Sequence, residues 1–282
     1  MVGDTHTLAA ELKGHDGPVW QVAWAHPKFG TLLASASYDG RVIVWRENGS
    51  SWTQLFVYKA HTSSVNSLAF APHEYGLMLA CASSDNDVSV LTHKSDDSWE
   101  PKRFFGHQIG GNAVSWCPAA APSATIVSAA NAPSAPAPQR FASGGCDNAV
   151  KIWAYSSDAG SWSEEACLTG HTDWVRDVAF APNLGLSSTT LASCSQDGTV
   201  IIWTQSEPGG SWKSTPLKAF GKEVVWRVSW SLSGGILAVS TGDNKVTLWK
   251  QSLDGEWQCI SSMQEGQAPQ QAGMPQAMQP VS

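Results

Sequence analysis

Short apolar runs alternate with polar turn residues along the chain, and these runs recur in the same order five times. Each repeat begins with a run that ends in an aromatic residue, such as VWQVAW at residues 19–24. A second run of small and apolar residues ends in Asp, a third ends in Trp or Leu, and a turn rich in Gly, Ser and Asp leads to a further Trp. Runs of this length, bounded by turn-forming residues, are typical of β-strands in hairpins. The pattern therefore predicts five units of four short strands.

Fixed landmarks hold the same register in every unit. The Asp that ends the second run recurs as Asp39, Asp85, Asp147, Asp197 and Asp243. Six residues after it stands Trp45, Leu91, Trp153, Trp203 or Trp249. Nine residues before the first-strand aromatic stands His15, His61, His107 or His171, and Gly221 in the fifth unit. Units of about 40–45 residues with these landmarks are the signature of WD-repeat β-propeller blades. We therefore expect an all-β, five-bladed propeller.

The landmarks also set the expected boundaries. The blades are expected at residues 14–59, 60–105, 106–169, 170–219 and 220–262, and residues 1–13 are expected to hold the outer strand of a preceding blade. The Ala-, Pro- and Ser-rich segment 118–139 falls outside the pattern, within the third blade. Because proline does not suit a sheet interior, we expect a disordered loop there. The Gln- and Pro-rich tail 263–282 is expected to be disordered as well.

The first strand of each unit predicts how the blades meet. Two residues before its aromatic stands an aliphatic residue in every unit, and one residue before it stands Ala or Ser. The aliphatic residues are Val22, Leu68, Val114, Val178 and Val228. Since side chains alternate between the two faces of a strand, we expect one face of this innermost strand to pack against the neighbouring blade.

The repeated His and Asp residues are interpreted as structural networks. In each blade the His is expected to bond to the Asp, and a Ser and the third-strand Trp to extend the network, because buried polar groups must be paired. The sets His15/Asp39/Trp45, His107/Asp147/Trp153 and His171/Asp197/Trp203 look complete, His61 and Asp85 lack the Trp, and Asp243 and Trp249 lack the His. These side chains are divided among blades and do not converge, so we expect neither a metal nor a cofactor.

Composition excludes several functions. The chain has 15 Trp, 8 Phe and 4 Tyr, and every Trp falls on a repeat position. The net charge of −7, from 17 basic and 24 acidic side chains, argues against a nucleic-acid partner. No apolar stretch reaches the roughly 18 residues of a membrane span, and residues 1–10 lack the layout of a signal peptide. No G-x-S-x-G, P-loop or H-E-x-x-H motif is present, so we expect no enzymatic activity.

One set of positions leaves two interpretations open. Four residues before the first-strand aromatic stand Trp20, Asn66, Asn112, Arg176 and Trp226, and Trp174 lies two residues before Arg176. Trp and Arg are favoured anchors of protein interfaces, so these residues are candidates for binding a partner. In the alternative interpretation, Trp20 and Trp226 cap the packing between blades.

Several segments resemble a particular family beyond the repeat class. The sequences HPKFG, APHEYG and GDNKVTLWK, together with the repeats between about residues 11 and 260, are similar to the small WD-repeat subunit of the COPII outer coat. The same subunit serves in the outer-ring Y complex of the nuclear pore. The resemblance implies a non-enzymatic scaffold of coat vesicles that carry protein from the endoplasmic reticulum to the Golgi.

The resemblance also implies partners and a location. Family members pair with a large helical-solenoid coat subunit or with nuclear pore solenoid subunits, and they join a complex of the lysosomal surface that regulates growth signalling. Their propeller is open, with six blades, and the partner supplies a further blade by strand addition between the first and the last. We accordingly expect a cytoplasmic protein that reaches the endoplasmic reticulum membrane and COPII vesicles indirectly, through the coat, and that also lies at the nuclear pore complex.

Two expectations qualify the resemblance. The chain shows five blades where the family has six, so its first blade is expected to be missing through a truncated gene model. The rival class is a generic WD-repeat adaptor, for example a ubiquitin-ligase substrate receptor, that presents its rim to a peptide. Such a peptide would be expected at Trp20, Arg176 and Trp226.

Overall fold

The repeat folds into five antiparallel sheets. We describe the protein from a computed structural model, which places residues 7–119, 138–183, 188–207, 209–217, 220–264 and 270–271. The first sheet comprises β1 (Val19–Trp24), β2 (Leu32–Ser37), β3 (Val42–Asn48) and β4 (Ser51–Tyr58), and the second comprises β5 (Val65–Phe70), β6 (Met78–Ser83), β7 (Asp87–His93) and β8 (Trp99–Phe105). The third comprises β9 (Gly111–Trp116), β10 (Arg140–Gly145), β11 (Ala149–Ser156) and β12 (Ser161–Thr169). The fourth comprises β13 (Val175–Phe180), β14 (Thr189–Ser195), β15 (Val200–Gln205) and β16 (Trp212–Pro216), and the fifth comprises β17 (Val225–Trp230), β18 (Ile236–Thr241), β19 (Lys245–Gln251), β20 (Trp257–Gln264) and β21 (Gln270–Gln271).

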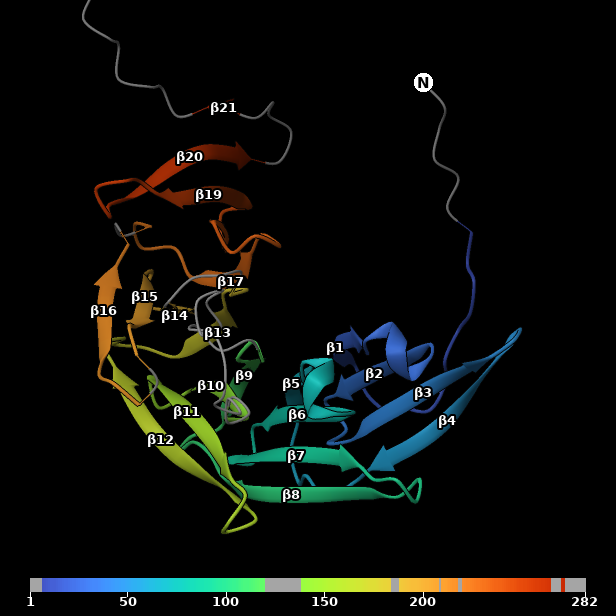
Figure 1. Ribbon diagram of the computed structural model, residues 1–282. Coiled ribbons are helices and arrows are strands. Elements are labelled where there is room, and N and C mark those ends of the chain that lie inside the picture. The colour runs from blue at the N-terminus through green and yellow to red at the C-terminus, as the bar shows by residue number, and fades with distance from the viewer. Residues whose placement is uncertain are drawn as a thin grey trace, which may run out of the picture.

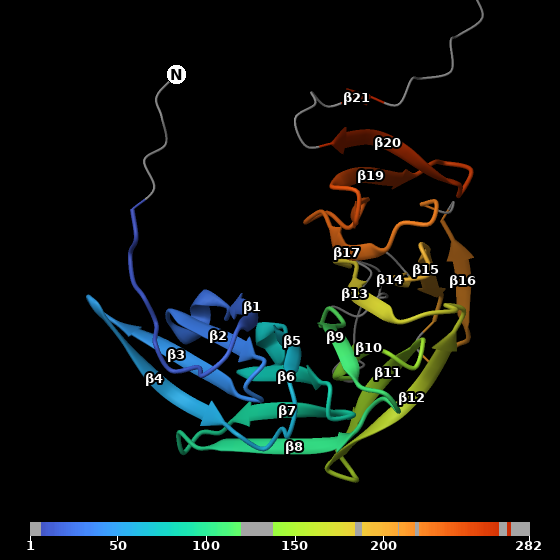
Figure 2. The same cartoon turned by 180° about the vertical axis from the view of Figure 1, so that it is seen from behind.

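The sheets stand side by side as blades around a common centre, which confirms the expected fold class. The first strands β1, β5, β9, β13 and β17 lie innermost (Figure 1). The strands β4, β8, β12 and β16 lie outermost in their blades, and in the last blade β21 pairs with the outer side of β20. Both views show the first sheet and the last sheet lying apart, so that the ring of blades is open between them (Figure 2). No helix among the described residues is long and apolar enough to cross a membrane.

Tight turns join the second and third strands in the same way in every blade. The residue after the landmark Asp is Gly or Asn, and its φ is positive in all five blades, from +60° at Asn244 to +79° at Gly40. Gly and Asn tolerate this left-handed conformation better than other residues do. Two 3-10 turns, η1 (Pro27–Phe29) and η2 (His73–Tyr75), follow the first strands of the first two blades and lie within the HPKFG and APHEYG motifs.

Side chains of the innermost strand fill the space between neighbouring blades. Leu68 of β5 is fully buried and packs with Ala34, Val42 and Val44 of the first blade. Burying a side chain of this size contributes about 1.5–3 kcal/mol. The aromatic at the end of the strand adds a hydrogen bond, since Trp116 Nε1 donates to the carbonyl oxygen of Ala69 at 2.8 Å. Trp230 makes the same bond to the Ala179 carbonyl oxygen at 2.9 Å, so the third and fifth blades are also hydrogen-bonded to the preceding blade.

The first blade has no such neighbour within the described chain. Val22 and Trp24 occupy the corresponding positions of β1, and their side chains are 55% and 61% exposed. The expectation that this face packs against a neighbouring blade therefore holds for the other four blades and is wrong for β1.

Two further expectations are corrected. Residues 7–13 form no strand, whereas an outer strand was expected within residues 1–13, of which 1–6 lie outside the described residues. A strand needs a paired neighbour, and the described hydrogen bond to this segment is a single one, from Gln54 Nε2 to the Lys13 carbonyl oxygen.

The tail also departs from the expectation. The strand β20 continues to Gln264, because Met263 and Gln264 still pair with β19, and β21 pairs with β20 through Ser261 and Ser262. Disorder from residue 263 onward is therefore wrong at these positions. Residues 265–269 and 272–282, like 120–137 of the expected loop 118–139, lie outside the described residues.

Candidate functional site

The first blade contains a polar network of four side chains next to the tight turn between β2 and β3: His15, Asp39, Ser35 and Trp45. Asp39 is an acceptor only, so His15 Nδ1 donates to its Oδ2 at 3.0 Å. The other ring nitrogen, Nε2, accordingly accepts from the Ser35 hydroxyl at 2.7 Å. The same hydroxyl accepts the indole N–H of Trp45 at 2.9 Å. Every member thus has a partner, which is what a buried polar network requires.

The third and fourth blades repeat this arrangement. The corresponding sets are His107, Asp147, Ser143 and Trp153, and His171, Asp197, Ser193 and Trp203. Each Asp also accepts backbone N–H groups of the loop and the turn, so it fixes the loop before the first strand onto the turn between the second and third. The structure therefore brings together the His, Asp and Trp that the sequence grouped, blade by blade.

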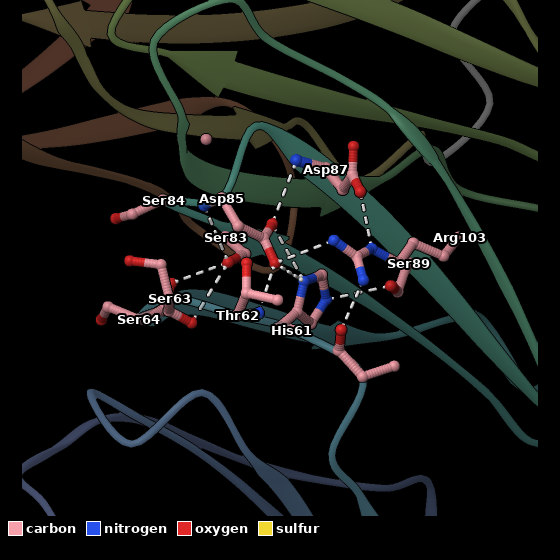
Figure 3. A network of polar contacts seen from close by, with 12 residues as sticks. His61, Thr62, Ser63, Ser64, Ser83, Ser84, Asp85, Asp87, Ser89 and Arg103 are labelled. Carbon is pink, nitrogen blue, oxygen red and sulfur yellow. Dashed lines mark hydrogen bonds and ion pairs between the residues drawn. The ribbon is translucent and has the colours of Figure 1, made fainter.

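The second blade builds its network differently. His61 Nδ1 donates to Asp85 at 2.9 Å, but its Nε2 lies 2.9 Å from the hydroxyl of Ser89 on the third strand β7. Figure 3 shows this cluster, with Arg103 reaching Asp85 from the outer strand β8. The hydroxyl of Tyr58, from the outer strand of the first blade, lies 3.0 Å from Ser89 Oγ.

The fifth blade, which lacks the His, has a reduced network. The indole N–H of Trp249 donates to the Thr247 hydroxyl at 2.9 Å. The Asp243 carboxylate accepts from the Thr241 hydroxyl at 2.5 Å, in the turn.

A simple rule relates the five networks. In the first, third and fourth blades the hydroxyl belongs to the second strand. In the second and fifth blades Cys81 and Val239 occupy that position, and the hydroxyl belongs to Ser89 or Thr247, the residue directly opposite on the third strand. Sequence reasoning missed both residues. The signal was present, because they stand two residues before the third-strand landmark in the two blades whose second strand lacks the Ser.

Electrostatics support a neutral imidazole beside an ionised carboxylate. Burial lowers the pKa of His61 and of His171, although their Asp partners oppose this effect. Burial would raise the pKa of the landmark Asp in each of the first four blades, but the N–H groups and the His bonded to it bring the net pKa below its ordinary value. The networks of the second and fourth blades therefore hold a neutral imidazole beside an ionised carboxylate near neutral pH. Among the described residues no three His, Cys, Asp or Glu side chains cluster as a metal site would need.

The candidate partner-binding residues lie on the inner strands and mostly bridge consecutive blades. Asn66 Nδ2 donates to the carbonyl oxygen of Gly111, and Asn112 Nδ2 to that of Val175, each in the next blade. The indole N–H of Trp20 donates to Ser64 Oγ of the second blade at 2.8 Å. The packing interpretation therefore accounts for Asn66, Asn112 and the polar end of Trp20.

The remaining three candidates come together between the fourth and fifth blades. The guanidinium of Arg176 lies over the ring of Trp174 at 5.0 Å and over the ring of Trp226 at 4.8 Å. Both indoles keep a large exposed fraction, 39% for Trp174 and 46% for Trp226.

The outward face of the last blade is a second open surface. In the first blade Ala36 and Val42 are opposite one another and fully buried under the second blade. Their counterparts in the last blade, Ser240 and Val246, are opposite one another too, but they are half-buried and line a shallow hollow with Met263. The positions that receive an incoming blade elsewhere in the ring are thus accessible here.

Five antiparallel blades, three of which contain a His–Asp–Ser–Trp network, define the chain as a WD-repeat β-propeller. The family described as WD domain, G-beta repeat matches residues 6–46, 52–90, 162–204 and 214–250. Relatives cover most of the chain. The "Protein transport protein sec13" of Aspergillus clavatus is 52% identical over 93% of this chain and 90% of its own length, and the "Protein transport protein SEC13" of Mycosarcoma maydis is 47% identical over 93% and 84%. The "Protein SEC13 homolog" of Drosophila melanogaster is 54% identical over 88% of this chain and 69% of its own length.

The chain therefore belongs to the Sec13 family. The names of the Aspergillus and Mycosarcoma relatives refer to protein transport. The resemblance read from the HPKFG, APHEYG and GDNKVTLWK segments is confirmed.

Proposed function

We propose that this chain is a structural subunit of the COPII coat and serves protein transport from the endoplasmic reticulum to the Golgi. Membership of a family whose members are named for protein transport supports the transport role. The open ring of blades supports the scaffold role, because an exposed blade face is a surface on which another β-structure can pack (Figure 1). The single observation that carries the proposal is this open face within a propeller of the Sec13 family.

The partner we propose is a large helical-solenoid coat subunit that contributes a further β-blade. The face of the last blade fits such an occupant. At the four blade-to-blade contacts an aliphatic first-strand residue, such as Leu68, enters between the second and third strands of the preceding blade. Ala238, Val246 and Leu248 offer the same kind of surface on the last blade and are half-buried. An inner strand with an aliphatic residue at the matching position would bury them, at about 1.5–3 kcal/mol for each large side chain.

We also propose two further roles that the family resemblance implies, one at the nuclear pore and one in growth signalling. The same face would serve solenoid subunits of the nuclear pore outer ring and a complex that regulates growth signalling. The corresponding locations are the cytoplasm, the surface of the endoplasmic reticulum and of COPII vesicles, which is reached through the coat, and the nuclear pore complex. No nucleic-acid contact is proposed, in keeping with the net charge of −7.

Affinity purification of the tagged full chain from its host tests the proposal. We expect a solenoid subunit in near one-to-one amount with the wild-type chain. The variant Val246→Asp places a charge on the face of the last blade and should lose this subunit. Leu253→Asp is the matched control, because Leu253 is fully exposed in the turn after β19, and should retain it. Recovery of only ubiquitin-ligase or chromatin subunits, or equal recovery with both variants, would overturn the proposal.

A further inference from the structure

One end of the propeller channel is framed by a regular rim. The rim consists of the loops that precede the first strands and the turns between the second and third strands. In every blade a backbone N–H of the turn donates to a carbonyl oxygen of the loop at 2.9 Å: Tyr38 to Pro18, Ser84 to Ser64, Cys146 to Gly110, Gln196 to Trp174 and Gly242 to Val224. Five identical bonds make this rim a rigid support for the side chains that it carries.

Large apolar side chains are exposed at this rim or at the adjoining start of an inner strand. They are Trp20, Tyr38, Ile109, Trp174 and Trp226. Exposed apolar residues that gather on a rigid surface mark an interaction site more often than isolated ones do. Trp and Tyr are also the residues that dominate binding energy at protein interfaces.

Arg176 is the positively charged residue of this surface, and among the described residues it forms no ion pair within 4.0 Å. Its guanidinium lies over the rings of Trp174 and Trp226, and its one acceptor among the described residues is the Gln196 amide oxygen. The buried Nε has no acceptor. By contrast, Arg41, Arg103, Arg140 and Arg227 each lie within 4.0 Å of a carboxylate.

The two indoles also restrict the guanidinium. A guanidinium that lies over indole rings keeps the N–H groups of its edge for hydrogen bonding, and that edge fits a carboxylate. An arginine fixed in this way loses little side-chain entropy when it binds.

We propose that the rim around Trp174, Arg176 and Trp226 is a docking surface for an extended segment of another protein that carries an acidic side chain between apolar ones. The carboxylate would accept from the Arg176 edge, and the flanking apolar groups would lie on the exposed parts of the two indoles. Charge supports this occupant, because the guanidinium pairs with no carboxylate within 4.0 Å in the part of the chain that the structure describes. The surface is separate from the face of the last blade, so the proposal stands or falls independently of the coat role.

A peptide selection tests the proposal. A phage library of short random segments is selected on the purified full chain, and enriched peptides are measured by fluorescence anisotropy. We expect enrichment of Asp or Glu flanked by apolar residues. The affinity of these peptides should fall at least about tenfold with Arg176→Ala and with Trp226→Ala. Arg176→Lys keeps the charge without the planar fork and should give an intermediate affinity.

The control for charge is Arg46→Ala, because Arg46 lies on β3 and has no carboxylate within 4.0 Å in the described chain. It should leave peptide affinity unchanged. Near-UV circular dichroism and thermal melting establish that each variant is folded. Three results would overturn the proposal: no enrichment, enriched peptides without an acidic residue, or unchanged binding to folded Arg176→Ala. Concentration-dependent dimers that Arg176→Ala abolishes would overturn it as well, since the occupant would then be a second copy of the chain.

Discussion

In the second blade the hydroxyl of the network belongs to Ser89 on the third strand, and its removal should lower the free energy of unfolding. Ser89→Ala removes the oxygen that lies 2.9 Å from His61 Nε2 and 3.0 Å from the Tyr58 hydroxyl, at a buried position. A buried polar group that loses its partner costs about 1–3 kcal/mol. Two such groups are affected, so we expect the free energy of unfolding to fall by about 2–6 kcal/mol.

The repeat also predicts how to restore the network. Cys81 stands directly opposite Ser89, at the position where three other blades carry the hydroxyl. Adding Cys81→Ser to Ser89→Ala should therefore return about 1–2 kcal/mol of the loss. Cys81→Ser alone adds a hydroxyl to a network that is already complete, and we expect it to be neutral or destabilising.

Urea denaturation of the four proteins gives the required double-mutant cycle. Tryptophan fluorescence and far-UV circular dichroism should give coincident transitions, so that free energies can be extracted. The coupling between the two positions should be favourable by more than 1 kcal/mol, which is an order-of-magnitude expectation for neighbours that share a partner (about 0.5–3 kcal/mol). A double variant no more stable than Ser89→Ala would refute the rule that the hydroxyl can stand on either strand.

Three further predictions follow from single sites. Thr247→Val should leave the Trp249 indole N–H without its acceptor and lower the free energy of unfolding by about 1–3 kcal/mol in the same assay; no change would contradict the assigned bond. Because burial holds the pKa of His61 below the free value of 6.5, the unfolded chain takes up this proton first, so the stability that His61 contributes is present above pH 6.5 and is lost as the pH falls toward the folded pKa; an NMR midpoint at or above 6.5 would contradict this. Gly40→Ala should lower the melting temperature more than Gly30→Ala, since both residues have positive φ but only an added methyl at position 40 meets a carbonyl oxygen, that of His61 at 2.9 Å; equal melting temperatures would count against this clash.

Much of the fold could be predicted because the repeat is written in local sequence. Turn residues, strand length and the landmark Asp depend on neighbours within a few positions, and the structure places the turns and strands where these signals stand. The His–Asp–Ser–Trp sets of three blades were predictable for the same reason. The roles of Ser89 and Thr247 do not follow from the landmark residues alone. They follow only from a comparison of opposite positions in the hairpin, where Cys81 and Val239 replace the Ser of the other blades.

Other features depend on contacts between blades and could not be predicted from the repeat alone. Whether Asn66 binds a partner or the next blade depends on the position of Gly111, more than forty residues away, across a blade boundary. Trp24 follows the repeat perfectly and is nevertheless exposed, since its expected partner surface lies in no described blade. The contact between the Arg176 guanidinium and the ring of Trp226 likewise joins the fourth blade to the fifth.

The central claim is that the face of the last blade receives a β-blade from a solenoid partner. Hydrogen–deuterium exchange of the chain, alone and in the purified complex, tests it most directly. The account predicts that the complex slows exchange in β18, β19 and β20, while the rim loop around Trp174 is unchanged. Slower exchange confined to that rim, or no change in the last blade, would contradict the claim.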